Sequence, residues 1–594
     1  MRVADYVMKR LFAAGIGHVF LVTGRGSLFL TDALAKNTSL EPVCVHHEQS
    51  AAFAAVAYAQ QSGGMGACLV STGCAATNAI TGVLSAWQDG IPCIFISGQN
   101  VLRETSRYSG IALRTYGQQE ADIISLVKPI TKYAQMITSA EQIVDVMDMA
   151  LTLANFGRKG PVWLDIPLDL QSATIEPDNM AISERSVPVL PRVSPDALGL
   201  VVSALTSAKR PAILIGSGVR SAGAEQDLRL FAKEWSIPVT FTASAPDVYG
   251  ADYPLSIGSV GSMGCSRAGN FTVQNADLVL VLGSRLNSLT TGLDFSSFAR
   301  SAQVIVVDID PIEHSKDSVN VDRLIISDLK YFLEQINLVK PKPSEKIWVL
   351  KCQHWKAQFR PVEPFFKCTD KVDLYELANC LSDILPSDIN IVTDSGLIEV
   401  ILPTNIRFSD GMRCIHPASQ GAMGYALPAA IGAYYASGKL TLAVIGDGSI
   451  MMNIQELETI KYRQLPIKIL VVNNNGYSII RRRQRDLFRR RSIGTDPGNG
   501  VSCPDFSKVA TCFDLKYFRI DDPGSLRAGL LDVLGSTVPT LCEIMGRPDQ
   551  GYIEIGQARS EVDRRLVRRP LEDQSPFLNR EVFLSEMIID PINQ

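Results

Sequence analysis

The segment 446–476 constrains the fold most, and it reads GDGSIMMNIQELETIKYRQLPIKILVVNNNG. An apolar run at 442–445 precedes it, and a second apolar run at 467–472 follows the break at Leu465-Pro466. Between the two runs, apolar residues recur every three to four positions, which is typical of a helix. The pattern therefore predicts a strand, a tight turn, a helix and a second strand parallel to the first. The periodic apolar residues are Ile450, Ile454, Leu457 and Ile460.

Asp447 and Asn474 stand at the ends of the two predicted strands. Parallel strands end at the same edge of a sheet, so the two side-chain oxygens can ligate one Mg²⁺ ion. Gly446 and Gly448 let the backbone approach an anion, and the helix start at Ser449 supplies amide donors. We therefore expect a metal-bound diphosphate here. The alternative interpretation is a β-α-β unit with ordinary tight turns.

The spacing from GDG to NN resembles the signature of the thiamine diphosphate enzymes. Over nearly its whole length the chain is similar to their acetohydroxyacid (acetolactate) synthase branch. The resemblance implies three doubly wound, parallel-sheet α/β domains: a pyrimidine-binding domain at 1–185, a middle domain at 190–345, and a diphosphate-binding domain with a C-terminal tail at 366–594. It also implies that the Gly476 carbonyl joins Asp447 and Asn474 around Mg²⁺.

Length and composition agree with several domains and exclude some classes of function. With 594 residues and 46% apolar content, the chain is too long for one core at about 150 residues per domain. A net charge of −4 and a pI near 6.0 give no overall attraction to nucleic acid or to an anionic membrane. We expect neither as a partner.

The 12 cysteines form no CxxC pair, which is typical of reduced thiols in a cytoplasmic protein. The N-terminal residues lack the apolar core and cleavage site of a secretory peptide. No run of 18 apolar residues occurs, so we expect no spanning helix.

Glu48 is the candidate catalytic residue of the first domain. It follows a predicted strand at 42–46 and begins an alanine-rich helix, at the strand edge where such sheets carry their sites. A glutamate that begins a helix can also serve only to complement the helix dipole. The resemblance implies that Glu48 binds a nitrogen of the aminopyrimidine ring and activates the cofactor.

Gln119 is a second candidate catalytic residue of this domain, and Gly24 and Lys128 are candidate substrate contacts. Gly24 lies in the turn after the predicted strand 19–22. Gln119 and Lys128 match polar positions on the substrate side of the resembling family, and either could instead be an ordinary surface residue. Related decarboxylases that release aldehydes carry paired histidines near this segment, whereas this chain has Gln118 and Gln119. The absence of the paired histidines from this segment favours carboligation over release of an aldehyde.

The middle domain has three predicted strands, each followed by a short loop, at 216–218, 283–285 and 308–311. A lone GxG after a strand is weak evidence for a dinucleotide. The resemblance implies that these loops hold FAD in a structural role, with Gly216 and Arg285 among its contacts. The arginine-rich continuation of the family is replaced here by Leu286-Asn287-Ser288.

Two segments of the third domain resemble cofactor-binding loops. Ser395 and Gly396 follow a predicted strand at 390–393, and they offer backbone contacts to the diphosphate. QGAMGYALP at 420–428 is similar to the family's GLGTMGxGLP. The resemblance implies that the Gly421 carbonyl accepts a hydrogen bond from the aminopyrimidine, while Met423 holds the cofactor bent. By composition alone, Met423 would be core filling.

Tyr477 and Arg481 are candidate substrate contacts after Gly476. Arg481 stands where acetohydroxyacid synthases have a tryptophan, and it begins a run with seven arginines at 481–491. Such a run is usually a solvated face or a partner surface. It could also bind a phosphorylated or nucleotide-linked acceptor, because guanidinium groups suit phosphate. The tail beyond 559 could close over the site.

The resemblance predicts a thiamine diphosphate- and Mg²⁺-dependent enzyme that decarboxylates a 2-oxo acid, pyruvate, and transfers the acyl unit to a carbonyl acceptor. A ketone or a keto sugar is the favoured acceptor, because Arg481 replaces the tryptophan. The first and third domains must face each other across the cofactor, which implies a homodimer or homotetramer with a shared site. The alternatives are cleavage or hydrolysis of a diketone or a 2-hydroxyacyl-CoA, and a non-catalytic binding subunit.

Overall fold

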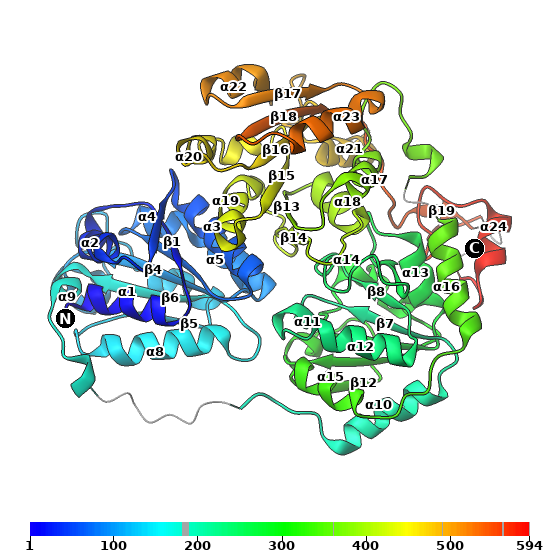
Figure 1. Ribbon diagram of the computed structural model, residues 1–594, viewed down its shortest axis with the longest axis horizontal. Helices are drawn as coiled ribbons and strands as arrows, with labels where there is room; N and C mark the ends of the chain where they lie inside the picture. Colours follow the sequence, from blue (N-terminus) through cyan, green and yellow to red (C-terminus); the bar gives the residue numbers. More distant parts are fainter. Residues whose placement is uncertain (181–188, 360–361, 490, 561–563, 593–594) are drawn as a thin grey trace.

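The computed structural model describes residues 1–180, 189–359, 362–489, 491–560 and 564–592. It contains three six-stranded parallel sheets with helices packed around them, and a short antiparallel hairpin (Figure 1). The prediction of three parallel-sheet α/β domains is thereby confirmed. The sheets fall inside the expected domain ranges, whose bounds stay predictions. Residues 181–188, at the boundary between the first and the middle domain, lie outside the described residues.

The first and third sheets have the same strand order. In each, the strands lie in the order second, first, third, fourth, sixth, fifth along the chain. The first and third domains therefore share one sheet architecture. The strands are β1 His18–Leu21, β2 Glu41–Cys44, β3 Gly66–Val70, β4 Cys93–Gln99, β5 Tyr133–Met136 and β6 Val162–Pro167 in the first sheet, and β13 Ile389–Thr393, β14 Arg413–Ile415, β15 Leu440–Gly446, β16 Lys468–Asn473, β17 Lys516–Ile520 and β18 Thr540–Met545 in the third.

The middle sheet has a different order. Read from one edge, its strands lie as third, second, first, fourth, fifth, sixth along the chain, which is the order of dinucleotide-binding sheets, with a crevice between the first and fourth strands. The first and fourth strands are β7 Pro211–Ile215 and β10 Leu278–Leu282, which pair in parallel. The others are β8 Val239–Phe241, β9 Ser256–Ser259, β11 Gln303–Asp308 and β12 Arg323–Ile326.

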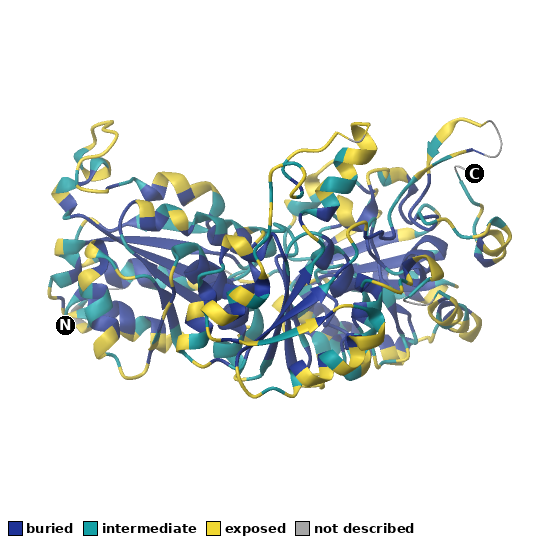
Figure 2. Cartoon of the chain, turned by 90° about the horizontal axis from the view of Figure 1, so that it is seen from above, coloured by how far each residue is buried: buried dark blue, intermediate teal, exposed yellow. Residues whose placement is uncertain are grey.

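Two helices rich in small residues join the first and third domains. Helix α3, Glu48–Ser62, and helix α19, Ala426–Ser437, lie side by side at the centre of the molecule (Figure 1). A side chain at Gly432 would place its Cβ 2.0 Å from the Ala54 carbonyl oxygen, so the close approach requires glycine. Residues 50–59 of α3 are all buried, which explains why this helix has no polar face. One continuous core therefore spans both domains (Figure 2).

The helix expected after the GDG turn is interrupted. A short 3₁₀ turn, η8 Ile450–Met452, is followed by α20, Glu456–Tyr462, with Asn453 between them. The buried Asn453 side chain accepts a hydrogen bond from Ser50 Oγ at 3.0 Å and donates one to the Gly424 carbonyl at 3.0 Å. These contacts with other segments take the backbone at Asn453 out of the helix, so the predicted single helix was wrong.

The C-terminal tail packs against the middle domain. The buried guanidinium of Arg267 donates hydrogen bonds to carbonyls of the tail, including that of Gln574 at 2.9 Å. None of the helices in the described ranges has the length and apolar character needed to cross a membrane. The helices near the sites described below are α5 Ile80–Asp89, α18 Leu397–Asn405, α21 Ser478–Leu487 and α23 Pro523–Leu534.

Candidate active site

The carboxyl edge of the third sheet brings the predicted metal ligands together. Strands β15 and β16 pair in parallel with Gly446 opposite Val472, so Asp447 and Asn474 follow at the same edge. The buried Asp447 carboxylate accepts hydrogen bonds from the Gly476 amide at 2.9 Å and the Gly448 amide at 2.8 Å. The hydrogen bond from Gly476 holds the turn of Asp447 against the loop of Asn474.

The Asn474 side chain has an acceptor left over. Its amide nitrogen donates to Ser478 Oγ at 3.1 Å, while its Oδ1 is buried and has no hydrogen-bond partner. Buried acceptors are almost always paired, so this oxygen indicates a bound ion or donor that completes the site. Burial raises the pKa of Asp447, which a bound cation would oppose. A carboxylate, an amide oxygen and the nearby carbonyl of Gly476 are hard oxygen ligands, so the residues fit Mg²⁺.

Glycines keep this edge open to an anion. A Cβ at Gly448 would lie 2.3 Å from the Tyr477 ring, and one at Gly476 would lie 2.0 Å from the Thr495 carbonyl oxygen. Gly476 also has φ +126°, which favours glycine. Tyr477 therefore lies against the turn Gly446-Asp447-Gly448-Ser449. The diphosphate-binding residues predicted in this turn form one short stretch of backbone.

Asp394 organises the site, and the sequence argument gave it no role. It is buried at the end of β13, and its carboxylate accepts hydrogen bonds from the Ser449 hydroxyl and from the amide of Ala426 at 2.8 Å. It also accepts hydrogen bonds from the amides of Ser395 at 2.8 Å and Gly424 at 3.2 Å. One carboxylate thus joins three predicted cofactor-binding segments. Its position between a predicted strand and Ser395-Gly396 was the available signal.

The loop before α19 presents Met423 to solvent. Met423 is 40% exposed, although the residues that follow it are buried. Gly421 has φ +59° and Gly424 has φ +80°, and a Cβ at Gly424 would meet that of Met452 at 2.5 Å. The glycines fix a loop shape that leaves an apolar side chain uncovered. Such a side chain has the freedom to support a bound molecule, which core filling would not allow.

Glu48 is the first residue of α3, at the carboxyl edge of the first sheet. Its carboxylate accepts a hydrogen bond from Asn78 Nδ2 at 2.9 Å and remains partly exposed. The next residue of α3 is tied to the third domain, because Gln49 Oε1 accepts a hydrogen bond from Asn453 Nδ2 at 3.1 Å. The helix that carries Glu48 is therefore held firmly, while the carboxylate itself stays accessible.

The other residues predicted in the first domain share this edge, except Lys128. Gly24 lies so close to Ser71 that a Cβ would be 2.5 Å from its hydroxyl. The carbonyl oxygen of Gln119 lies 1.6 Å from where a Cβ of Gly73 would be, so the Gln119 segment covers the turn after β3. Lys128 follows α7, Ile123–Val127, and is exposed. The described contacts bring Gly24 and Gln119, but not Lys128, to this edge.

The two first arginines of the run at 481–491 have partners inside the protein. Arg481 donates to the carbonyls of Asn474 at 3.3 Å, Asn475 at 3.2 Å and Pro548 at 2.5 Å. Arg482 pairs with Glu554 at 2.6 Å and lies over the Tyr552 ring. Arg481 therefore supports the loop of a predicted metal ligand. The remaining described arginines of the run are exposed, and Arg490 lies outside the described residues.

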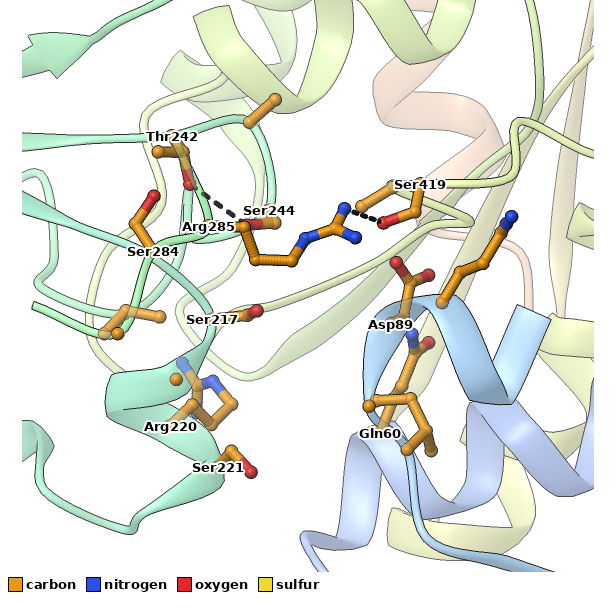
Figure 3. A pocket seen from close by; sticks show the side chains of 18 of the residues that line it. Gln60, Asp89, Ser217, Arg220, Ser221, Thr242, Ser244, Ser284, Arg285 and Ser419 are labelled. Carbon is orange, nitrogen blue, oxygen red and sulfur yellow. Dashed lines mark hydrogen bonds between the residues drawn. The ribbon is translucent and has the colours of Figure 1, made fainter. Parts of the chain in front are cut away.

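A cavity of about 660 Å³ lies where the three domains meet (Figure 3). The loops after β7 and β10 line it, at the crevice of the middle sheet, and Asp308, the last residue of β11, also lines it. A Cβ at Gly216 would lie 2.3 Å from the Gly283 carbonyl, so these two loops touch. Arg285 extends across the cavity and donates to Ser419 Oγ at 2.7 Å. The loops predicted to hold FAD therefore border one cavity.

Three family models match the chain, and all describe thiamine pyrophosphate enzymes. The N-terminal TPP binding domain matches residues 1–126, the central domain matches 198–336, and the C-terminal TPP binding domain matches 394–544. The chain therefore belongs to the thiamine pyrophosphate enzyme family. The predicted resemblance is confirmed.

Within that family, the chain is similar to acetolactate synthase large subunits. It is 32% identical to the isozyme 2 large subunit of Escherichia coli (strain K12), over 92% of this chain and 95% of the relative. It is 30% identical to the large subunit of Parasynechococcus marenigrum (strain WH8102), over 91% and 87%, and 32% identical to that of Buchnera aphidicola subsp. Schizaphis graminum (strain Sg), over 86% and 88%. The predicted thiamine diphosphate-dependent, carboligase-type enzyme is confirmed.

Proposed function

We propose that this protein decarboxylates pyruvate with thiamine diphosphate and Mg²⁺ and joins the acyl unit to a carbonyl acceptor. The observation that carries the metal-dependent part is the buried, unpartnered Asn474 Oδ1 at the same sheet edge as Asp447. The names of the relatives support carboligation of the acetolactate synthase type. When bound, thiamine diphosphate supplies an electron sink for loss of carbon dioxide.

Each segment at the edge of the third sheet has a role in this proposal. Asp447, Asn474 and the Gly476 carbonyl hold the cation. The backbone at Ser395 and Gly396, together with the turn from Gly446 to Ser449, binds the diphosphate through amide donors. The carbonyl oxygen of Gly421 would accept a hydrogen bond from the amino group of the pyrimidine ring. The exposed Met423 would support the middle of the cofactor. Asp394 holds these segments at fixed positions by the four hydrogen bonds described above.

Glu48 is the proposed acid-base residue. Its carboxyl group hydrogen-bonds a ring nitrogen of the pyrimidine and exchanges a proton with it. The single hydrogen bond from Asn78 orients this carboxyl group without burying it. We propose that the Glu48 of one chain serves the third domain of a second chain, so that a homodimer is the smallest active unit and a homotetramer contains two such pairs.

The acceptor is proposed from the chain's departures from its family. Gln118 and Gln119 stand in the segment where related decarboxylases carry paired histidines, so this segment supplies no imidazole to protonate the acyl unit before it reaches an acceptor. A ketone or a keto sugar suits a site without the tryptophan of the synthases. Gly24 and Tyr477 are the proposed contacts of the acceptor at this site. Lys128 stays a candidate on the exposed surface.

The cavity of the middle domain is proposed to bind FAD in a structural role. The strand order of the middle sheet supports a dinucleotide at the crevice between β7 and β10. Gly216 allows the close contact of the two loops there, and Arg285 offers a guanidinium to the phosphates.

The test is incubation of the purified protein with pyruvate, thiamine diphosphate, Mg²⁺ and a panel of ketones and nucleotide-linked keto sugars. The proposal expects release of carbon dioxide and a product whose mass equals the acceptor plus the two-carbon acyl unit. Carbon dioxide with free acetaldehyde as the sole product would contradict carboligation. Cleavage of a diketone or of a 2-hydroxyacyl-CoA without any ligation would favour the lyase alternative. Absence of every reaction, with cofactor bound, would favour a binding subunit.

A further inference from the structure

The loop after β1 presents an arginine at the carboxyl edge of the first sheet, the edge that carries Glu48. Strand β1 pairs in parallel with β2 on one side and with β3 on the other. The loops that follow these three strands therefore meet at one edge. Glu48 begins the helix after β2, and Arg25 begins the 3₁₀ turn η1, Arg25–Ser27, after β1. Gly24 was a predicted substrate contact, whereas its neighbour Arg25 had no predicted role.

Close backbone packing fixes the position of this loop. The Gly26 amide donates a hydrogen bond to Ser71 Oγ at 3.0 Å, and the Gly26 carbonyl accepts one from Gln171 Nε2 at 2.6 Å. A Cβ at Gly98, near the end of β4, would lie only 2.0 Å from the same carbonyl oxygen. The residue after Arg25 is therefore held by three other segments, so the Arg25 side chain extends from a rigid backbone.

A glutamine orients the exposed guanidinium of Arg25. The Nη1 atom of Arg25 donates a hydrogen bond to Gln118 Oε1 at 2.6 Å. The backbone carbonyl of Gln118 in turn accepts a hydrogen bond from Asn100 Nδ2 at 2.9 Å, which anchors the Gln118 segment just beyond β4. Gln118 is neutral, and no carboxylate of the described residues lies within ion-pair distance of Arg25. A guanidinium has five N–H donors and a permanent positive charge, so both are available to a ligand.

The chemistry of the reaction decides which ligand suits this arginine. Guanidinium groups bind the oxygen atoms of carboxylates and phosphates. In the proposed reaction, both the 2-oxo acid donor and the acceptor could carry such a group. A cation held against the carboxylate of the donor would stabilise the group that must leave as carbon dioxide, and so would slow that step. An anionic group on the acceptor is retained in the product, so its binding carries no such cost.

We propose that Arg25, oriented by Gln118, determines acceptor specificity by binding an anionic group of the acceptor, a carboxylate or a phosphate. The inference rests on the proposed carboligation and names the chemical class of its acceptor. Gly24, a proposed contact of the acceptor, precedes Arg25 in the chain. The guanidinium therefore lies next to the position proposed for the acceptor. Gln118 acts through Arg25 and is a positioning residue.

The experiment compares two pairs of acceptors, with isotopically labelled pyruvate as the donor. Each pair has a charged and a neutral member: 2-oxobutanoate with its methyl ester, and dihydroxyacetone phosphate with dihydroxyacetone. The formation of product that carries the labelled two-carbon unit gives kcat/KM for each acceptor. We expect the charged member of one pair to be preferred about tenfold or more, because hydrogen bonds between charged groups are the strong ones. The pair that shows the preference identifies the anionic group as a carboxylate or a phosphate.

Three variants link this preference to Arg25. Arg25→Gln should raise the KM of the preferred charged acceptor about tenfold, with a much smaller change for its neutral counterpart. Arg25→Lys keeps the charge and should retain part of the preference, which a merely structural role would not produce. Gln118→Leu should raise the same KM about threefold, because the guanidinium remains but loses its orienting acceptor. The control Arg527→Gln removes an exposed arginine on α23 and should change nothing. Thermal unfolding of each variant shows that the fold is retained.

Chemical labelling of arginines gives a second measurement that needs no turnover. Phenylglyoxal modifies exposed arginines, and mass spectrometry of peptides follows the modification of Arg25 and Arg527. With thiamine diphosphate and Mg²⁺ present, the preferred charged acceptor should slow the modification of Arg25 severalfold and leave that of Arg527 unchanged.

The inference is overturned if neither charged acceptor is preferred over its neutral counterpart, or if the preference survives Arg25→Gln. Failure of ligation with every acceptor would contradict the proposed function. In that case the labelling decides the inference, which is overturned if neither charged acceptor protects Arg25 better than its neutral counterpart does.

Discussion

The Asp394 carboxylate accepts a hydrogen bond from the Ala426 amide at 2.8 Å, which ties the end of β13 to the first residue of α19. Because Met423 and Gly424 precede that helix, the contact fixes the loop on which the proposed cofactor would bend. Burial raises the pKa of Asp394, and the four donors around it oppose that effect. The role of this carboxylate is to hold the Ser395, Gly424, Ala426 and Ser449 segments together through hydrogen bonds.

Asp394→Ala should weaken thiamine diphosphate binding. The substitution leaves the Gly424 and Ala426 amides without an acceptor in a buried place, at about 1–3 kcal/mol for each, so a fall in affinity of about tenfold or more is expected. Calorimetric titration with the cofactor and Mg²⁺ measures it. The control Asp388→Ala removes a carboxylate of the same domain that pairs with Lys439 at the surface. Equal affinities of the two variants would refute the role of Asp394.

Glu48→Gln should abolish turnover and leave cofactor binding intact. The amide keeps the shape and the contact with Asn78 but cannot exchange a proton with the pyrimidine ring. We expect carbon dioxide release from pyruvate to fall by about a hundredfold or more. Full activity of this variant would remove Glu48 from the mechanism. Asn78→Ala should have a smaller effect, because it only loosens the orientation of the carboxyl group.

Arg481→Ala should weaken the response to Mg²⁺. Its guanidinium holds the carbonyls of Asn474 and Asn475, so its loss frees the loop of a proposed metal ligand. The concentration of Mg²⁺ that gives half-maximal activity should rise severalfold. Arg485→Ala serves as the control, because Arg485 is exposed on the same helix. If Arg481 instead binds an anionic acceptor, the KM of that acceptor will rise while the Mg²⁺ response stays unchanged.

Asp165 should make the protein less stable as the pH rises. It is buried in β6, and burial raises its pKa to about 7 despite hydrogen bonds from Ser97 and Gln99. Between the unfolded pKa, near 4, and the folded one, the native state keeps a proton that the unfolded state has lost, so stability falls as pH rises through this window. The loss between pH 5.5 and 8 is about 2 kcal/mol.

Thermal unfolding at these two pH values measures this effect. Asp165→Asn should reduce the difference between the two unfolding temperatures. The control Asp532→Asn, which removes an exposed carboxylate on α23, should preserve it. An unchanged difference in Asp165→Asn would show that Asp165 does not titrate in this range.

Periodic patterns explain why the fold and the Asp447–Asn474 pair could be predicted. Apolar runs that alternate with helical segments determine a parallel sheet, and parallel pairing places the residues after β15 and β16 at one edge.

Long-range contacts explain what sequence patterns missed. The role of Asp394 depends on donors from residues 424, 426 and 449, which no local spacing reveals. The break at Asn453 comes from Ser50, about four hundred positions earlier in the chain. Arg481 stays a predicted substrate contact, and no sequence pattern indicated that its guanidinium binds carbonyls of its own domain and lies near Asp496.

The most direct test of the metal-bound cofactor is a titration of thiamine diphosphate into wild-type protein and Asn474→Ala, with and without Mg²⁺. The account predicts tight binding by the wild type only with Mg²⁺, and a loss of about tenfold or more in Asn474→Ala, because one hard oxygen ligand is missing. Binding by the wild type that is equally tight without Mg²⁺, and unchanged by the substitution, would contradict it.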